Sequence, residues 1–120
     1  MIKSIPAHVL VLMILTPALV AFGQVLFKMS GQRLAAYPGS GFRDLVIDPV
    51  FISAMALYGG ATFLWVYVLK AVPLSYAYSF MAVTYVLVPL FAVLWLGETL
   101  NLKYFLGLGL VLAGLFTLWS

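Results

Sequence analysis

The chain has 120 residues, of which 66% are hydrophobic and 8% are charged, and its formal net charge is +3. Because an ordinary soluble domain has about 25% charged residues, this composition excludes a soluble globular protein. The small, dispersed charge argues against nucleic-acid binding, and the absence of Cys excludes disulfides and thiolate chemistry.

Four apolar stretches are long enough to cross a bilayer, whose hydrocarbon core needs about 20 apolar residues in a helix. They cover residues of about 9–28, 50–69, 75–96 and 103–119. The sequence therefore predicts an all-α integral membrane protein with one four-helix transmembrane domain over residues 1–120. Four helices are too few to enclose a large pathway, so we expect an oligomer.

The first span carries small and polar residues on one side. Pro17, Ala21, Gln24 and Lys28 follow one another at spacings of four, three and four residues, which places them on one helix face. Two interpretations of this face stay open. Either it packs against another helix while Lys28 reaches the lipid headgroups, or Gln24 faces a substrate. Lys3 and the apolar run also resemble a secretory signal, but the run is longer than usual, and we expect it to be retained.

The connection over residues 30–49 is the only long one. We expect a solvated loop there, with a short interfacial turn around Phe42 as the alternative. The second span follows Pro49 and has the small residues Ser53, Ala56 and Gly60 on one face, where we expect another helix to approach closely. Residues 70–75 form so short a link that the second and third spans are expected to form an antiparallel hairpin.

The third span is the most polar of the four. Ser75, Tyr78, Ser79, Ala82, Tyr85 and Pro89 share one helical face. A polar group without a partner costs several kcal/mol in hydrocarbon, so this face must meet a neighbouring helix, water or a substrate. Pro89 lacks an amide hydrogen, and we expect the helix to bend there.

The last loop and the fourth span suggest a cap and a contact surface. Thr99 or Asn101 is placed to cap the fourth helix. Glu98 is the only carboxylate near a span; a headgroup-level or capping role and a role as a proton carrier both stay open. Small residues, which favour close helix association, follow along the fourth span at Gly107, Gly109, Ala113 and Gly114.

The positions of Lys and Arg give a weak orientation. Four of them lie in the first and third loops, against Lys3 and Lys70 on the other side. Since positive loops stay in the cytoplasm, we expect these two loops inside and both termini outside, with insertion in both orientations as an open alternative.

Three segments together resemble the four-helix branch of the drug/metabolite transporter superfamily. They are the sequence FGQVLFK over 22–28, VPLSYAYS over 72–79, and GETL over 97–100 followed by GLGLVLAG over 107–114. Small multidrug resistance exporters in this branch carry a glutamate eight residues before the Lys that ends the first helix, and a Trp three residues after the Tyr that matches Tyr78. This chain has Val20 and Met81 at those positions. The run over 74–88 is instead similar to the subunits that flip aminoarabinose-undecaprenyl phosphate.

This resemblance implies a flippase subunit in the bacterial inner membrane that moves an undecaprenyl-phosphate-linked sugar. Its partner would be a second copy or a related four-helix subunit, with the small residues of the fourth span at the contact. No cofactor, metal or enzyme activity is expected, because no span holds paired acids or a ligand cluster. The candidate substrate-binding residues are Tyr78, Ser79, Tyr85, Gln24 and Lys28, and Glu98 is a candidate gate or anchor. The alternatives are an exporter of a cationic drug or metabolite, and a non-transporting partner of a membrane glycosyltransferase.

Overall fold

The computed structural model describes residues 5–119, and Lys3 of the orientation argument lies outside them. The elements in this range are α1 (Ala7–Ala36), α2 (Phe42–Val46), α3 (Pro49–Ala71), α4 (Leu74–Phe80), the 3-10 helix η2 (Met81–Val83), α5 (Thr84–Leu96) and α6 (Leu102–Trp119). Four helical stretches are long and apolar enough to cross a membrane: α1, α3, the run from α4 through α5, and α6. The predicted all-helical fold with four spans is confirmed for the described residues.

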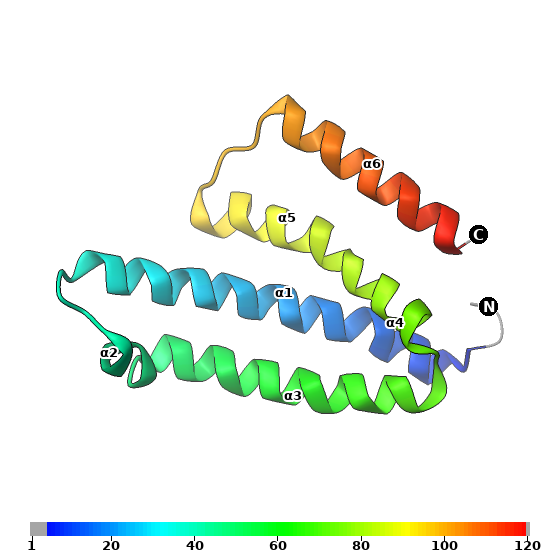
Figure 1. Cartoon of the computed structure of the whole chain (residues 1–120), viewed down its shortest axis with the longest axis horizontal. Coiled ribbons are helices and arrows are strands. Elements are labelled where there is room, and N and C mark those ends of the chain that lie inside the picture. Colours follow the sequence, from blue (N-terminus) through cyan, green and yellow to red (C-terminus); the bar gives the residue numbers. More distant parts are fainter. Residues whose placement is uncertain (1–4, 120) are drawn as a thin grey trace.

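Helix α1 lies between α3 and α5 (Figure 1). Along α3, the buried residues Ala54, Ala61 and Val68 are seven residues apart, a spacing that keeps them on one helix face. The face on which we expected another helix carries Ser53, Ala56 and Gly60, and all three are exposed. Within this chain, another helix therefore packs on a different face of α3. The core cluster forms where α1, α3 and α4 meet, and contains Val9, Met13, Val68, Val72, Ala77 and Phe80.

Helix α1 is longer than the predicted span, which ended near residue 28. Its 30 residues correspond to a length of about 45 Å, against a hydrocarbon thickness of about 30 Å. The extra turns are tied to α3 by the ion pair between Arg33 Nε and Asp48 Oδ1, at 3.2 Å. The same Asp48 oxygen accepts a hydrogen bond from the amide of Val50 and so caps α3.

The third span is interrupted in its middle. The α-helical pattern stops at Phe80, changes to a 3-10 turn over Met81–Val83 and resumes at Thr84. The Thr84 hydroxyl donates to the Met81 carbonyl at 2.7 Å, and hydroxyls that bond to nearby carbonyls compete with the helical pattern. The irregular segment therefore precedes Pro89, which lies inside α5, and the expected bend at Pro89 stays a prediction.

Helix α6 is attached to the rest of the chain at its C-terminal end. The Trp119 ring stacks on Phe80 with ring centroids 4.9 Å apart, and the Trp119 indole N–H donates to Ser79 Oγ at 2.8 Å. At the other end, Asn101 Oδ1 accepts a hydrogen bond from the amide of Tyr104, which confirms the predicted cap. None of the residues of α6 is buried.

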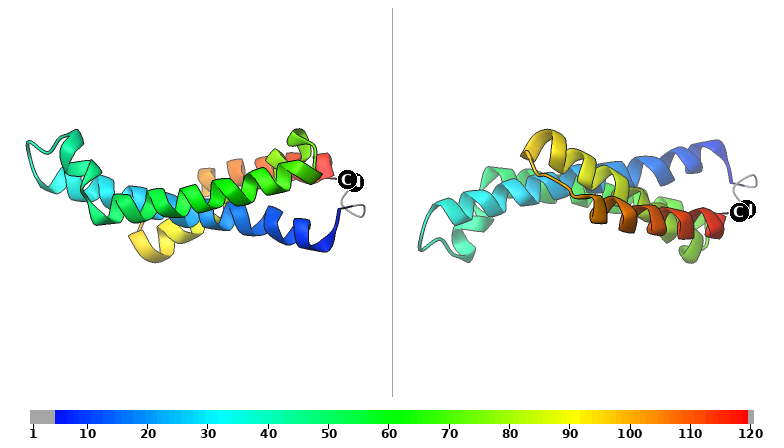
Figure 2. Two further views of the ribbon diagram at one scale, coloured as in Figure 1. Left: turned by 90° about the horizontal axis from the view of Figure 1, so that it is seen from below. Right: turned by 90° about the horizontal axis from the view of Figure 1, so that it is seen from above.

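The molecule is flat, with extents of 52 × 36 × 19 Å. Seen edge-on in Figure 2, the helices form a thin layer and do not surround a central space. A single chain thus provides a wall for a pathway through the membrane but does not enclose one.

Candidate functional site

A cavity of about 610 Å³ lies among α1, α3, the α4–α5 run and the start of α6. We call it the headgroup cavity. Its lining combines hydroxyl, amide and aromatic side chains with a few aliphatic ones. The lining residues are Thr16, Val20, Gln24, Tyr58, Ala61, Thr62, Trp65, Tyr78, Met81, Thr84, Tyr85, Val88, Pro89 and Tyr104.

Three of the candidate substrate-binding residues meet in this cavity. Gln24 comes from α1, Tyr78 from α4 and Tyr85 from α5. The 3-10 turn lies between the two tyrosines along the chain, so the wall that carries them is the interrupted part of the third span. Their role in binding stays a prediction, but the structure places them on a common polar surface.

The structure places Ser79 elsewhere. Its hydroxyl donates to the Tyr76 carbonyl at 2.6 Å and accepts the Trp119 indole N–H. Ser79 lines a second cavity of about 440 Å³, which Leu115 and Leu118 of α6 also line. The serine thus holds α6 against α4 and does not face the headgroup cavity.

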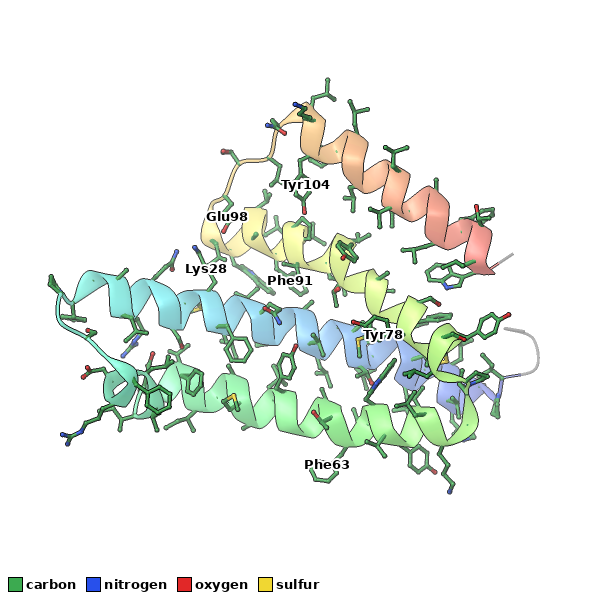
Figure 3. The ribbon with its side chains drawn as sticks, viewed as in Figure 1. Lys28, Phe63, Tyr78, Phe91, Glu98 and Tyr104 are labelled. Carbon is green, nitrogen blue, oxygen red and sulfur yellow. The ribbon has the colours of Figure 1, made fainter. Side chains whose placement is uncertain are left out.

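The charged candidates lie at one end of the bundle. Figure 3 shows Lys28 on α1 and Glu98 beyond the end of α5 at the same end, and both side chains are exposed. Among the described residues Glu98 makes no ion pair, but its amide N–H donates to the Ala92 carbonyl at 3.1 Å and closes the end of α5. Gly97, with a φ of 70°, makes this left-handed turn possible.

The sequence reasoning missed the contribution of α3. Tyr58, Thr62 and Trp65 follow at spacings of four and three residues and share the face that lines the cavity. That spacing could have indicated the lining face. The prediction instead placed the contact on another face of the same helix, because that face carries small residues. Tyr104 of α6 was also missed, and Figure 3 shows it pointing from α6 toward α5.

Tyr58 is held in place by α1. Gln24 Nε2 donates to the Tyr58 hydroxyl oxygen at 3.2 Å, and the rings of Phe27 and Tyr58 have centroids 5.5 Å apart. Gly23 leaves room for the tyrosine, since a Cβ at that position would come within 3.2 Å of the Tyr58 ring. Gln24 therefore lines the cavity and, together with Phe27, positions an aromatic ring from α3.

The hydroxyl hydrogens of the threonines that line the cavity are already used in hydrogen bonds to backbone carbonyls. Thr16 donates to the Leu12 carbonyl, Thr62 to the Tyr58 carbonyl and Thr84 to the Met81 carbonyl, at 2.7–2.9 Å. Each hydroxyl oxygen keeps lone pairs that accept hydrogen bonds.

The tyrosine hydroxyls complement these acceptors. In the part of the chain that the structure describes, the hydroxyls of Tyr78, Tyr85 and Tyr104 make no intramolecular hydrogen bond. A hydroxyl group both donates and accepts, so the cavity offers donors as well as acceptors to a guest molecule.

The cavity lining carries no formal charge, because it includes no Asp, Glu, Lys, Arg or His. Val20 lies in the lining at the position where the exporters carry their glutamate. Among residues 5–119, no three His, Cys, Asp or Glu side chains are grouped to hold a metal ion. Hydrogen bonds from its hydroxyl and amide groups and contacts with its aromatic rings are therefore what this lining offers a guest molecule.

These features define a small multi-pass membrane protein with an uncharged cavity lined by hydroxyl, amide and aromatic side chains. The chain belongs to the EamA-like transporter family, whose family model matches residues 1–120. The resemblance to transporters of this kind is thus confirmed.

Relatives of known name cover most of the chain. Two of them are named probable 4-amino-4-deoxy-L-arabinose-phosphoundecaprenol flippase subunit ArnE, from Aeromonas salmonicida and Aeromonas hydrophila; each is 30% identical over 105 residues, which is 88% of this chain and 91% of the relative. A protein of the same name from Yersinia pestis is 30% identical over 104 residues, or 87% of this chain and 90% of the relative. No solved structure matches this chain significantly.

Proposed function

We propose that the protein is a subunit of a flippase that moves an undecaprenyl-phosphate-linked sugar, of the aminoarabinose type, across the bacterial inner membrane. The observation that carries this proposal is the uncharged headgroup cavity, lined by hydroxyl groups and aromatic rings. The names of the relatives support the lipid-linked substrate. Translocation breaks no covalent bond, so the site needs no acid, base or nucleophile.

The sugar is proposed to bind within the headgroup cavity. A sugar hydroxyl that leaves water must find new hydrogen-bond partners, because an unpaired polar group is costly in a membrane. Gln24, Tyr78 and Tyr85 supply donors and acceptors, while the faces of Tyr58 and Trp65 offer flat apolar surface for the sugar ring.

The phosphate is proposed to stay near the membrane edge. Lys28 does not line the cavity and is exposed at the end of the bundle. A cation at the centre of the bilayer costs about 3 kcal/mol or more, and the position of Lys28 avoids this cost. Glu98 lies at the same end and is kept as a candidate gate or loop anchor.

A second subunit is proposed to complete the pathway, either another copy or a related four-helix chain. The helices form a flat layer, so a single chain does not enclose the cavity on every side. The small residues Gly107, Gly109, Ala113 and Gly114 of α6 are all exposed, and a helix surface of this kind permits close approach of another helix.

Tyr78→Phe tests the proposal, since it removes one cavity hydroxyl and keeps the ring. A lost hydrogen bond of about 1 kcal/mol should slow translocation by roughly fivefold. The assay is labelling of the lipid-linked sugar in the outer leaflet of intact cells, corrected for protein abundance. Tyr76→Phe is the matched control, because Tyr76 lies on the same helix but does not line the cavity. Equal rates for both variants and the wild type would contradict the assignment of the site.

The alternative functions give different results in vesicles. Dye uptake driven by a pH gradient would favour a cationic exporter, although the cavity holds no carboxylate to exchange protons. A non-transporting partner would leave lipid translocation absent in vesicles while stabilising a glycosyltransferase. Translocation restricted to polyprenyl-phosphate-linked sugars supports the flippase.

A further inference from the structure

The second cavity, of about 440 Å³, lies between the interrupted third span and the C-terminal part of α6. Its walls include Met81 and Ala82 from η2, and Leu115 and Leu118 from α6. We call the part formed by these four residues the tail groove. Ser75 and Ser79 also line this cavity, so its surface changes from polar to apolar.

The tail groove and the headgroup cavity share part of their lining. Tyr78, Met81, Thr84 and Tyr85 line both spaces. A single molecule with a polar head and an apolar chain that lies along these four residues would therefore contact both cavities.

Helix α6 forms one side of the tail groove and is fixed to α4 at its C-terminal end. Trp119 fixes the C-terminal end of the helix to α4, and no residue of α6 is buried. Near the other end, Tyr104 lines the headgroup cavity. Helix α6 thus lies beside the run from α4 through α5 (Figure 1) and is fixed to α4 near its C-terminal end.

We propose that the tail groove binds the first isoprene units of a polyprenyl phosphate while its headgroup occupies the headgroup cavity. This inference rests on the proposed function, because it takes an amphiphilic substrate to occupy both cavities at once. Apolar walls alone do not distinguish a substrate tail from bulk lipid. The four residues that line both cavities favour a substrate tail, because a chain attached to a headgroup in one cavity starts beside the other.

A photoreactive probe tests this placement. The protein is reconstituted in vesicles of phosphatidylethanolamine and phosphatidylglycerol with undecaprenyl phosphate that carries a diazirine on its first isoprene unit. Adducts are mapped by mass spectrometry. We expect them on the peptides that contain Met81, Leu115 and Leu118, and we expect unlabelled undecaprenyl phosphate, but not added phosphatidylglycerol, to suppress them.

Variants that fill the groove give the second readout. Leu115→Trp places a large ring in the groove, and the loss of burial of about two methylene groups should reduce labelling roughly tenfold. Leu118→Trp serves as a second variant, since the Leu118 side chain is exposed and its replacement does not disturb a core. Leu110→Trp is the control, because Leu110 is exposed on the same helix and lines neither cavity.

Three results would overturn the tail groove. The first is suppression of the adducts by phosphatidylglycerol, which indicates bulk lipid. The second is equal labelling of the wild type and both groove variants. The third is a disulfide between two copies of Leu115→Cys, which indicates that another subunit fills the groove; the chain has no other Cys to confuse this result.

Translocation of the lipid-linked sugar, measured in the same vesicles, separates this inference from the proposed function. Normal translocation in Leu115→Trp with unchanged labelling overturns the groove alone. Specific labelling without any translocation by the wild type supports the groove as a binding site and overturns the flippase.

Discussion

Trp119 joins α6 to α4 by a hydrogen bond and a ring contact, so Trp119→Leu should loosen the C-terminal end of the helix. The substitution removes the hydrogen bond to Ser79 at 2.8 Å and the stacking on Phe80 at 4.9 Å. A hydrogen bond between membrane helices contributes about 0.6 kcal/mol on average, and an aromatic pair adds about 0.5–1.5 kcal/mol. The sum of about 1–2 kcal/mol shifts the equilibrium between attached and detached α6 by a factor of about 5–30.

A distance measurement in lipid nanodiscs reports this loosening. Spin labels are placed at Phe116→Cys on α6 and Phe63→Cys on α3, two exposed positions outside both cavities, and labelled protein is diluted with unlabelled protein. The distance distribution should broaden in Trp119→Leu and broaden less in Trp119→Phe, which keeps the stacking. A pair at Val11→Cys and Phe63→Cys, on α1 and α3, should not change. An unaltered distribution in Trp119→Leu would refute the idea that this residue attaches α6.

Three further predictions concern the cavity, the loop end and the subunit contact. Val20→Glu places a carboxylate in the uncharged cavity, so binding of a cationic dye should increase while lipid translocation falls; fluorescence titration and outer-leaflet labelling measure the two effects. Asp48→Ala removes the cap of α3 and the partner of Arg33, and should lower the free energy of unfolding by about 1 kcal/mol, measured by denaturant titration in detergent. Gly114→Leu meets open space within the chain, so it should weaken dimerisation in light scattering without loss of folded protein, whereas Gly59→Leu on α3 should not; equal dimerisation of both variants contradicts the α6 contact.

Hydropathy was sufficient to predict the four spans, because a bilayer requires about 20 apolar residues for each helix. The polar stripe of the third span was also readable, since hydroxyl groups at membrane depth need partners, and Tyr78 and Tyr85 do line a cavity. The helical face of α3 was not predicted correctly. Small residues such as Gly60 allow close packing but do not require it, and α1 packs on the face that carries Ala61 instead.

Two details of the structure were not marked by the usual signals in the sequence. Ser79 has the spacing of a cavity residue, but the Trp119 indole, 40 positions away, takes its hydroxyl as an acceptor. The irregular turn over Met81–Val83 was likewise not signalled by a proline or glycine within it. A hydrogen bond between a side-chain hydroxyl and a nearby carbonyl, as at Thr84, competes with the α-helical hydrogen bonds. Such a bond can interrupt a helix where the sequence has no proline or glycine.

The uncharged lining of the headgroup cavity has a consequence for the membrane potential. An elementary charge that crosses 100 mV gains or loses about 2.3 kcal/mol. Since no Asp, Glu, Lys, Arg or His belongs to this lining, a movement of the cavity walls alone carries no formal charge through the electric field. For a guest that moves past this lining, the membrane potential therefore acts on the charges that the guest itself carries.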